Sequence, residues 1–167
     1  MTTPDTFPRT NPSQTGRVFQ INISPGGVPK AAVQLAELTF MGLVGDNQVN
    51  KEVHGGIDRA VTLFGLEIIQ ALQAEGHPVY PGALGENLTV SGLDWHLIQP
   101  GMQLCLGEEI RLEVTRFVAP CSKISAYLTE GNIERVSQKS YPGWSRLAAR
   151  VIYPGMLRVG DLVKLFQ

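Results

Sequence analysis

Residues 110–123 read Ile110-Arg-Leu-Glu-Val-Thr-Arg-Phe-Val-Ala-Pro-Cys-Ser-Lys123, and the rest of the chain is organised around this stretch. From Ile110 to Thr115, apolar residues alternate with polar ones, which is the two-residue period of a half-buried β-strand. Pro120 lacks a backbone N–H donor and therefore ends the strand. The stretch therefore predicts a β-strand with Cys121 just beyond its end.

Cys121 allows two interpretations. Arg116 and Lys123 flank it, and nearby cations favour the thiolate, which is the form that attacks electrophiles or binds metals. A free cysteine is also often a small buried apolar residue without a chemical role. The stretch alone leaves both open.

Composition narrows the class of protein. The 167 residues suffice for one domain with its own core, and 43% are hydrophobic. The net charge of −1 provides no global basic field, so we expect neither a nucleic-acid nor a membrane partner. Two cysteines, Cys105 and Cys121, do not make a disulfide framework, and no secretory pattern or membrane-length apolar run is visible. We therefore expect a cytoplasmic protein with a reduced Cys121.

Local patterns predict the elements. The 18 glycines and 11 prolines imply many turns and short elements, hence a mainly β fold. Residues 1–15 are expected to be a flexible N-terminal tail and residues 16–167 a single domain. The expected strands are Val18–Ile23, Ala31–Leu38, Ala60–Phe64 and Leu147–Tyr153. The expected hairpins cover Gly101–Thr115 and Met156–Phe166, the latter through Gly160-Asp161. The expected helices are Gly65–Ala74 and a short one within Asn132–Ser140.

Two glycine-rich loops carry polar groups suited to a ligand. In His54-Gly-Gly-Ile-Asp-Arg59, adjacent glycines allow backbone amides to approach a ligand closely. In Gly85-Glu-Asn87, the amide of Asn87 can donate and accept at once, which suits the edge of a heterocycle. Each loop taken alone is also compatible with an ordinary turn. There is no zinc-ligand spacing, no P-loop and no G-x-S-x-G motif, and the sequence does not show whether Cys121 meets His54.

The order of these segments resembles the MOSC domain family, named for its relation to the C-terminal part of molybdenum cofactor sulfurases. The matching stretches are Gly45-Asp46, His54–Val61, Gly82–Thr89, Pro100-Gly101, Arg116 through Cys121, and Gly160–Val163. They extend over nearly the whole chain from about Val18, and the likeness is to the stand-alone bacterial members. The resemblance implies a distorted β-barrel with a few short peripheral helices.

The resemblance also implies a site for the molybdenum cofactor, molybdopterin with its Mo. Cys121 would be the catalytic residue and the thiolate ligand of the metal, and a soft thiolate suits such a metal. The family motif assigns cofactor binding to His54, Gly56, Asp58, Arg59, Asn87 and Arg116. Lys51 and Lys123 would add local positive charge, so we expect Cys121 at the floor of a positively lined cleft within reach of the His54–Arg59 loop.

Function follows from the same resemblance. Some family members reduce N-hydroxylated compounds, which implies a small N-hydroxylated substrate and a separate electron-donor protein. Others handle the sulfur of the cofactor, so a non-catalytic carrier of the cofactor or its sulfur is the alternative. A metal-free cysteine enzyme that pairs Cys121 with His54 is a third possibility. Pyridoxal phosphate binding is a further expectation attached to the family.

Overall fold

A computed structural model describes residues 12–47 and 56–167. The strands of these two segments run in the order β1 (Gln14–Ile23), β2 (Ala31–Val33), β3 (Leu35–Thr39), β4 (Gly42–Leu43), β5 (Val61–Gly65), β6 (Leu88–Ser91), β7 (Gln103–Leu106), β8 (Ile110–Phe117), β9 (Leu147–Tyr153), β10 (Gly155–Arg158) and β11 (Leu162–Phe166). The helical elements are α2 (Leu66–Ala74) and the 3₁₀ turns η1 (Ile57–Arg59), η2 (Trp95–Leu97), η3 (Ser122–Tyr127), η4 (Thr129–Gly131) and η5 (Ile133–Val136).

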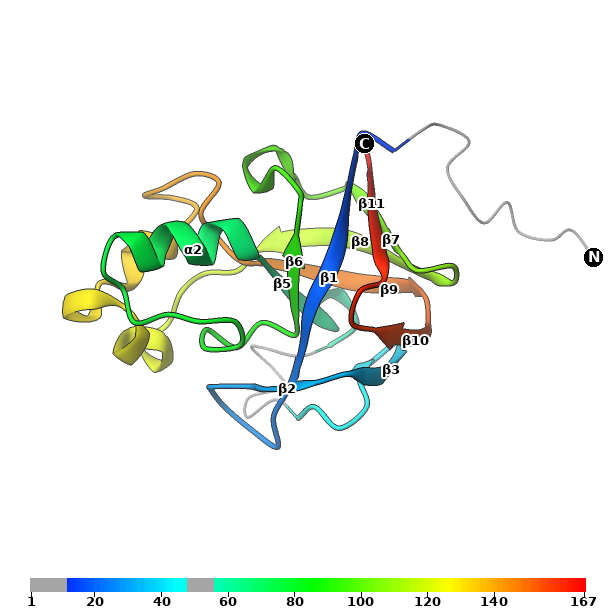
Figure 1. Cartoon of the computed structure of the whole chain (residues 1–167), viewed down its shortest axis with the longest axis horizontal. Coiled ribbons are helices and arrows are strands. Elements are labelled where there is room, and N and C mark those ends of the chain that lie inside the picture. Colours follow the sequence, from blue (N-terminus) through cyan, green and yellow to red (C-terminus); the bar gives the residue numbers. More distant parts are fainter. Residues whose placement is uncertain (1–11, 48–55) are drawn as a thin grey trace, which may run out of the picture.

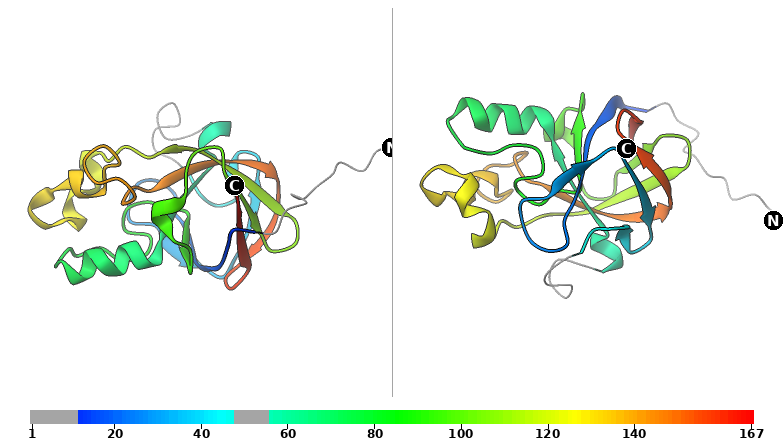
Figure 2. Two further views of the ribbon diagram at one scale, coloured as in Figure 1. Left: turned by 90° about the horizontal axis from the view of Figure 1, so that it is seen from above. Right: turned by 60° about the horizontal axis from the view of Figure 1, so that its bottom comes forward.

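Seven of the described strands close into a barrel. Their order is β11-β7-β8-β9-β5-β6-β1, and β11 pairs with β1 to complete the circle, while β2 extends from β1. Figure 2 shows the strands curling around a common interior, with α2 and the 3₁₀ turns η3 to η5 to one side. Closure pairs both edges of the sheet, which removes the unpaired strand edges of an open sheet. The expected mainly β, distorted barrel is confirmed.

The helix α2 connects two parallel strands. β5 and β6 are parallel, and the chain passes from one to the other through α2 (Figure 1). Parallel neighbours need such a crossover, since a tight turn can join only antiparallel strands. Ile68, Ile69 and Leu72 form the buried face of the helix, which confirms the helix expected at Gly65–Ala74. Among the described residues, no helix has the length and apolar character to cross a membrane.

A second, three-stranded sheet has the order β10-β3-β4. The strand pairings of this sheet correct two predictions made from the sequence. The strand expected at Ala31–Leu38 is divided, because β2 pairs with β1 in the barrel whereas β3 pairs with β10. The hairpin expected at Met156–Phe166 is wrong, since β10 and β11 separate after the turn and β11 pairs with β7 and β1.

Two further expectations shift at their boundaries. β1 begins at Gln14, which pairs with Leu165, so the last residues assigned to the tail belong to the barrel. The helix expected within Asn132–Ser140 is only the 3₁₀ turn η5, from Ile133 to Val136. The strand at Leu147–Tyr153 and the hairpin of β7 and β8 are confirmed.

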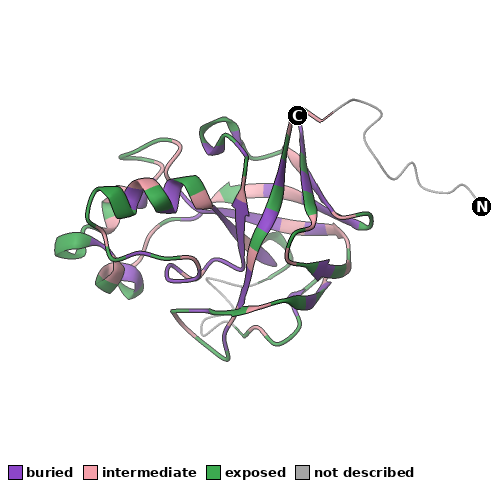
Figure 3. Ribbon diagram, viewed as in Figure 1, coloured by how far each residue is buried: buried purple, intermediate pink, exposed green. Residues whose placement is uncertain are grey.

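The core lies inside the barrel and between the barrel and α2. Phe64, Leu63 and Leu88 are fully buried on the parallel strands, and Figure 3 shows burial concentrated along the barrel strands. Trp95 packs edge-to-face on Phe64 with ring centroids 6.3 Å apart. Its indole Nε1 donates to the carbonyl of Ser145 at 2.8 Å, which fixes the segment that enters β9. This segment forms one wall of the site.

Candidate functional site

A pocket opens where the end of β8, the start of β9 and the loop between β1 and β2 meet. The empty space within it is about 710 Å³, which includes solvent at its open mouth. Its lining residues are Gly27, Val28, Lys30, Asn47, Arg59, Thr62, Leu84, Gly85, Val118, Cys121, Lys123, Ile124, Arg146 and Ala148. Four of these described residues carry positive charge and none is acidic, so the pocket is electropositive around the thiol.

Hydrogen bonds between the end of β8 and the start of β9 hold the backbone segment that leads to Cys121. β8 ends at Phe117, and the next residue, Val118, donates its N–H to the carbonyl of Arg146 at 2.9 Å. The hydroxyl of Ser145 donates to the carbonyl of Val118 at 3.1 Å. Cys121 then takes an extended backbone conformation and directly precedes η3. Its thiol is free and half-buried, so it is held by the backbone but accessible from the pocket.

Arg146 is a desolvated cation beside that thiol. Its Nη1 donates to the carbonyl of Leu84 at 2.5 Å, while its buried Nε has no hydrogen-bond partner among the described residues. Burial lowers the pKa of Arg146, and the nearby Glu86 and Cys121 oppose this shift by attraction. An arginine that is buried with an unsatisfied donor beside a pocket can bind an anionic or acceptor group there.

Glu86 is the buried counter-charge of Arg146. The side chain is fully buried, and its Oε1 accepts from the backbone N–H of Gly82 at 2.5 Å and from the hydroxyl of Thr89 at 3.3 Å. Burial raises the pKa of Glu86, although these hydrogen bonds and Arg146 act in the opposite direction. The carboxylate lies behind the pocket wall, so it compensates Arg146 without placing negative charge in the pocket.

A second buried polar network consists of the side chains of Asn87, Asp46 and Lys30. The ammonium of Lys30 contacts both carboxylate oxygens of Asp46, at 2.6 and 2.7 Å. Asp46 also accepts from the side-chain amide of Asn87 at 2.9 Å and from the backbone N–H of Ser24 at 2.9 Å. The amide oxygen of Asn87 accepts from the backbone N–H of Thr62 at 3.0 Å. These hydrogen bonds and the ion pair hold Lys30 at the pocket wall.

The turn η1 brings Arg59 to the pocket. β8 and β9 shift register between Val114 and Arg116, and a bulge of this kind redirects a side chain. Here the hydroxyl of Thr115 donates to the carbonyl of Asp58 at 2.5 Å, which ties η1 to β8. Burial and the neighbouring Arg116 both lower the pKa of Arg59. Two guanidinium groups therefore lie close together at this side of the pocket.

The structure brings only part of the predicted set together. Cys121 and Arg59 line the same pocket, so the described C-terminal end of the His54–Arg59 loop reaches the thiol. Arg116 lies beside Arg59 but outside the lining, and Asp58 is exposed and 4.0 Å from Arg150. Gly56 lines a neighbouring pocket with Asp46 and Asn47. Asn87 is buried and bonded within the protein. His54 and Lys51 lie outside the described residues.

Lys30, Thr62 and Arg146 line the pocket but were not predicted from the sequence. Arg146 begins the run into β9 and resembles an ordinary polar residue at a strand end. Lys30 lies in a turn-like segment that gave no motif. Its only sequence signal was proximity to Pro29 and Gly27, which indicates a turn but no chemistry.

Comparison with known proteins identifies the family to which this chain belongs. A family model described as the MOSC domain matches residues 50–164, more than half of the chain. The chain belongs to the MOSC domain family. This MOSC domain is 30% identical to the protein YiiM of Escherichia coli over 81% of its own length, and 29% identical over 75% to a protein named Reductase from Gibberella moniliformis.

Solved structures agree with the fold. The crystal structure of YiiM from Escherichia coli covers 93% of the chain with a TM-score of 0.66 and 24% identity. That of YiiM from Geobacillus stearothermophilus covers 91% with a TM-score of 0.69 and 21% identity. This MOSC domain spans 71% and 75% of those two structures. It spans less than two thirds of the curated relatives, 63% of YiiM and 23% of the Gibberella protein.

MOSC domains are associated with the molybdenum cofactor, and the pocket residues fit that group. The described residues contain no cluster of three or more His, Cys, Asp or Glu that could hold a metal. The positive lining suits an anionic group, and the unsatisfied Nε of Arg146 supplies a donor. At Gly85 (φ 85°), a Cβ would lie 2.9 Å from Val28, so a glycine keeps this wall open.

Proposed function

We propose that this MOSC domain binds the molybdenum cofactor around Cys121 and reduces small N-hydroxylated compounds. The observation that carries the proposal is the pocket itself, in which one accessible thiol is surrounded by four cationic side chains and no acidic one among the described residues. The family and its relative named Reductase support an oxidoreductase of this kind.

The chain's own residues have distinct roles in this proposal. Cys121 provides the thiolate that ligates the metal, and its backbone is fixed by the bonds that link Val118 to Arg146 and Ser145. Arg146 and Lys30 hold anionic or acceptor groups of the cofactor from two sides of the pocket. Arg59 and Arg116, on the η1 side, bind the cofactor or orient the substrate. Asn87 acts indirectly, because its side-chain amide positions Asp46 and Asp46 in turn positions Lys30.

The bound cofactor would supply the two-electron chemistry that breaks the N–O bond. The balance is one N-hydroxylated compound, two electrons and two protons giving the parent N–H compound and water. The electrons come from a separate donor protein, and the protons come from solvent. The pocket residues orient the substrate and compensate charge, which are the contributions that proteins make to cofactor chemistry.

A carrier that passes on the cofactor or its sulfur would use the same thiol and the same pocket. Turnover separates the two functions. The experiment uses protein made in a host that synthesises the cofactor, with reduced methyl viologen as donor. The substrates are an amidoxime, a hydroxamic acid and an aryl hydroxylamine. We expect viologen oxidation with at least one of them, and loss of this activity in Cys121→Ala.

Binding of cofactor without turnover of any substrate would instead indicate the carrier. Full activity in Cys121→Ala, or in protein without molybdenum, would refute the proposed function. Activity without molybdenum that is abolished by iodoacetamide would indicate a metal-free cysteine enzyme.

A further inference from the structure

Positive charge is concentrated in the two segments that frame the pocket. Residues 114–129 and 135–150 contain no Asp or Glu, although the whole chain has 15 acidic residues and a net charge of −1. They contain Arg116, Lys123, Arg135, Lys139, Arg146 and Arg150. Such an uneven distribution produces a local positive field on a nearly neutral protein, which can steer and orient a charged partner.

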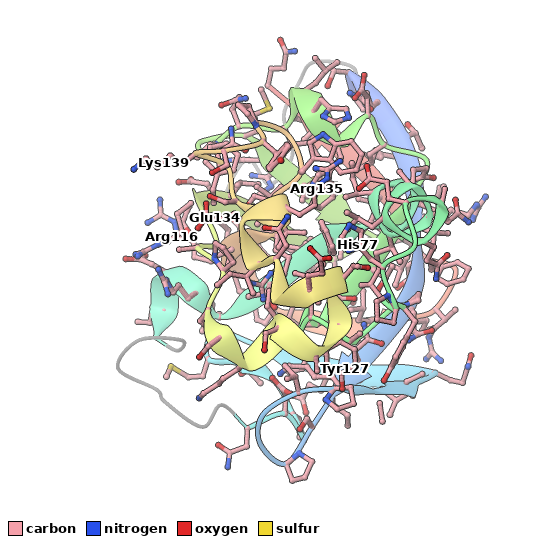
Figure 4. All side chains as sticks on the ribbon, turned by 90° about the vertical axis from the view of Figure 1, so that its left-hand side faces the viewer. His77, Arg116, Tyr127, Glu134, Arg135 and Lys139 are labelled. Carbon is pink, nitrogen blue, oxygen red and sulfur yellow. The ribbon has the colours of Figure 1, made fainter. Side chains whose placement is uncertain are left out.

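Three of these cations are on the surface. Arg116, Lys123 and Lys139 are exposed and form no ion pair with any described residue. Lys123 lines the pocket, and Arg116 is close enough to Arg59 to lower its pKa. Figure 4 shows Arg116 and Lys139 projecting at the same edge of the molecule, with Glu134 labelled between them. We call Arg116, Lys123 and Lys139 the basic rim.

Acidic groups near the basic rim are only partly engaged. Arg150 pairs with Glu113 at 2.6 Å and approaches Asp58 at 4.0 Å. Glu134 accepts a hydrogen bond from the hydroxyl of Ser140 at 2.7 Å and is the exposed acid closest in sequence to Lys139. The three cations of the rim are opposed by two exposed acids of the intervening segment, Glu130 and Glu134, so the rim keeps a positive balance.

The segment that carries Lys139 is rigidly attached. Arg135 donates from Nε and Nη2 to the carboxylate of Glu75 at 2.9 and 2.7 Å, which joins η5 to the end of α2. The same guanidinium lies 3.8 Å from the ring centroid of Trp144 and 4.5 Å from that of Tyr141. A preorganised surface loses little conformational entropy when a partner binds.

We propose that the basic rim is the docking surface for an acidic electron-donor protein that carries a reduced flavin or an iron–sulfur cluster. The proposal rests on the proposed function, which requires two electrons from another protein close to Cys121. The rim adjoins the mouth of the pocket, so docking there brings the donor near the site of reduction. Lys139 does not line the pocket, and this favours a protein-sized partner over a ligand held inside it.

The first test measures binding to the cofactor-free chain, with a small acidic flavodoxin as the probe. We expect binding that weakens steeply between 20 and 200 mM salt, because exposed charges are screened. Lys139→Glu should weaken binding roughly 3–10-fold, and Glu134→Lys should strengthen it, since rim charges act through steering and weak pairing. Lys164→Glu, at an exposed position of β11, is the matched control and should leave the affinity unchanged.

Equal flavodoxin affinities in Lys139→Glu, Glu134→Lys and the control would overturn the proposal. So would salt-independent binding. A single-stranded DNA oligonucleotide that binds more tightly than flavodoxin, with the same variant pattern, would assign the rim to nucleic acid and would also overturn it.

The second test uses the cofactor-loaded protein with two electron donors. Lys139→Glu should lower the rate supported by flavodoxin roughly 3–10-fold and leave the rate supported by methyl viologen unchanged, because the small donor does not need the surface. Equal losses with both donors would contradict docking. If wild-type protein shows no turnover with methyl viologen, the proposed function fails, and the binding measurements alone then decide whether the rim is an acidic-protein site.

Discussion

Replacing Asp46 with Asn should reveal how strongly the pocket wall depends on one carboxylate. The side chains of Asp46 and Lys30 are only 6% and 8% exposed, and their charged atoms are 2.6 Å apart. The substitution keeps one acceptor for Ser24 but leaves the Lys30 ammonium buried without its counter-charge. Removing one partner of a buried ion pair costs about 3–5 kcal/mol. This is a large share of the roughly 5–15 kcal/mol that stabilises a domain.

The assay is urea unfolding and thermal denaturation of the purified protein. For a chain of this length, a loss of 1 kcal/mol lowers Tm by about 2–4 °C, so Asp46→Asn should lower it by roughly 6–20 °C. Asp161→Asn is the control, because Asp161 accepts one backbone hydrogen bond in an exposed turn, at 2.9 Å from the N–H of Arg158. The control should cost about 1 kcal/mol or less.

A double-mutant cycle with Lys30→Met separates the ion pair from general packing. The double variant should be destabilised less than the sum of the two single variants, because removing both charges leaves neither unpaired. Strictly additive losses, or a cost of Asp46→Asn no greater than that of Asp161→Asn, would refute the buried-pair account.

Three other predictions concern the pocket wall and the segment beyond it. The raised pKa of Glu86 means that the folded protein holds this proton more tightly than the unfolded chain, so the residue should make the free energy of unfolding fall as pH rises above about 4.3. Urea titrations from pH 4 to 8 should show this slope reduced in Glu86→Gln, and a steeper fall in the variant would contradict the burial argument. Gly82→Ala should cost at least about 2 kcal/mol more than Gly101→Ala, because both residues have positive φ but an added Cβ would lie 2.5 Å from the carbonyl of Lys30 only at Gly82; equal unfolding midpoints would exclude this clash. Arg135→Lys keeps the charge but loses the paired bonds to Glu75 and the stacking on Trp144, so it should cost about 1–2 kcal/mol and speed proteolysis between residues 122 and 145, whereas unchanged proteolysis would show that Arg135 does not anchor this segment.

Local patterns sufficed for elements whose neighbours are near in sequence. The mainly apolar run Leu147–Tyr153 and the helical spacing in α2 each depend on a few consecutive residues, and both predictions are confirmed. The barrel class followed from the family resemblance, and the closing pair of β1 with β11 confirms it. That pair joins the two ends of the domain, a relation that no local pattern encodes.

The errors arose where one local pattern suits several long-range pairings. Gly160-Asp161 does form a turn, but the strands on either side enter different sheets. The alternation within residues 31–38 is equally compatible with one strand or two, and the partners of β2 and β3 decide the break at Gln34. The helix expected near residue 132 is shortened to η5, which is tied to α2 by Arg135 and Glu75.

The candidate site shows the same division. Cys121 and Arg59 could be named because the ordered motifs mark their positions, and the structure brings both to one pocket. Arg146 and Lys30 could not, since their significance depends on burial and on partners far away in sequence, Glu86 and Asp46. Asn87 was expected to contact the ligand, but its amide is used within the protein.

The most direct test of the central claim is the molybdenum content of Cys121→Ala, measured by mass spectrometry after expression in a cofactor-producing host. Cys105→Ala is the matched control, because Cys105 is buried in β7 and does not line the pocket. We expect close to one molybdenum per chain in wild-type protein and in Cys105→Ala, and almost none in Cys121→Ala. Molybdenum retained in full by Cys121→Ala, or absent from wild-type protein, would contradict the assignment of Cys121 as the metal ligand.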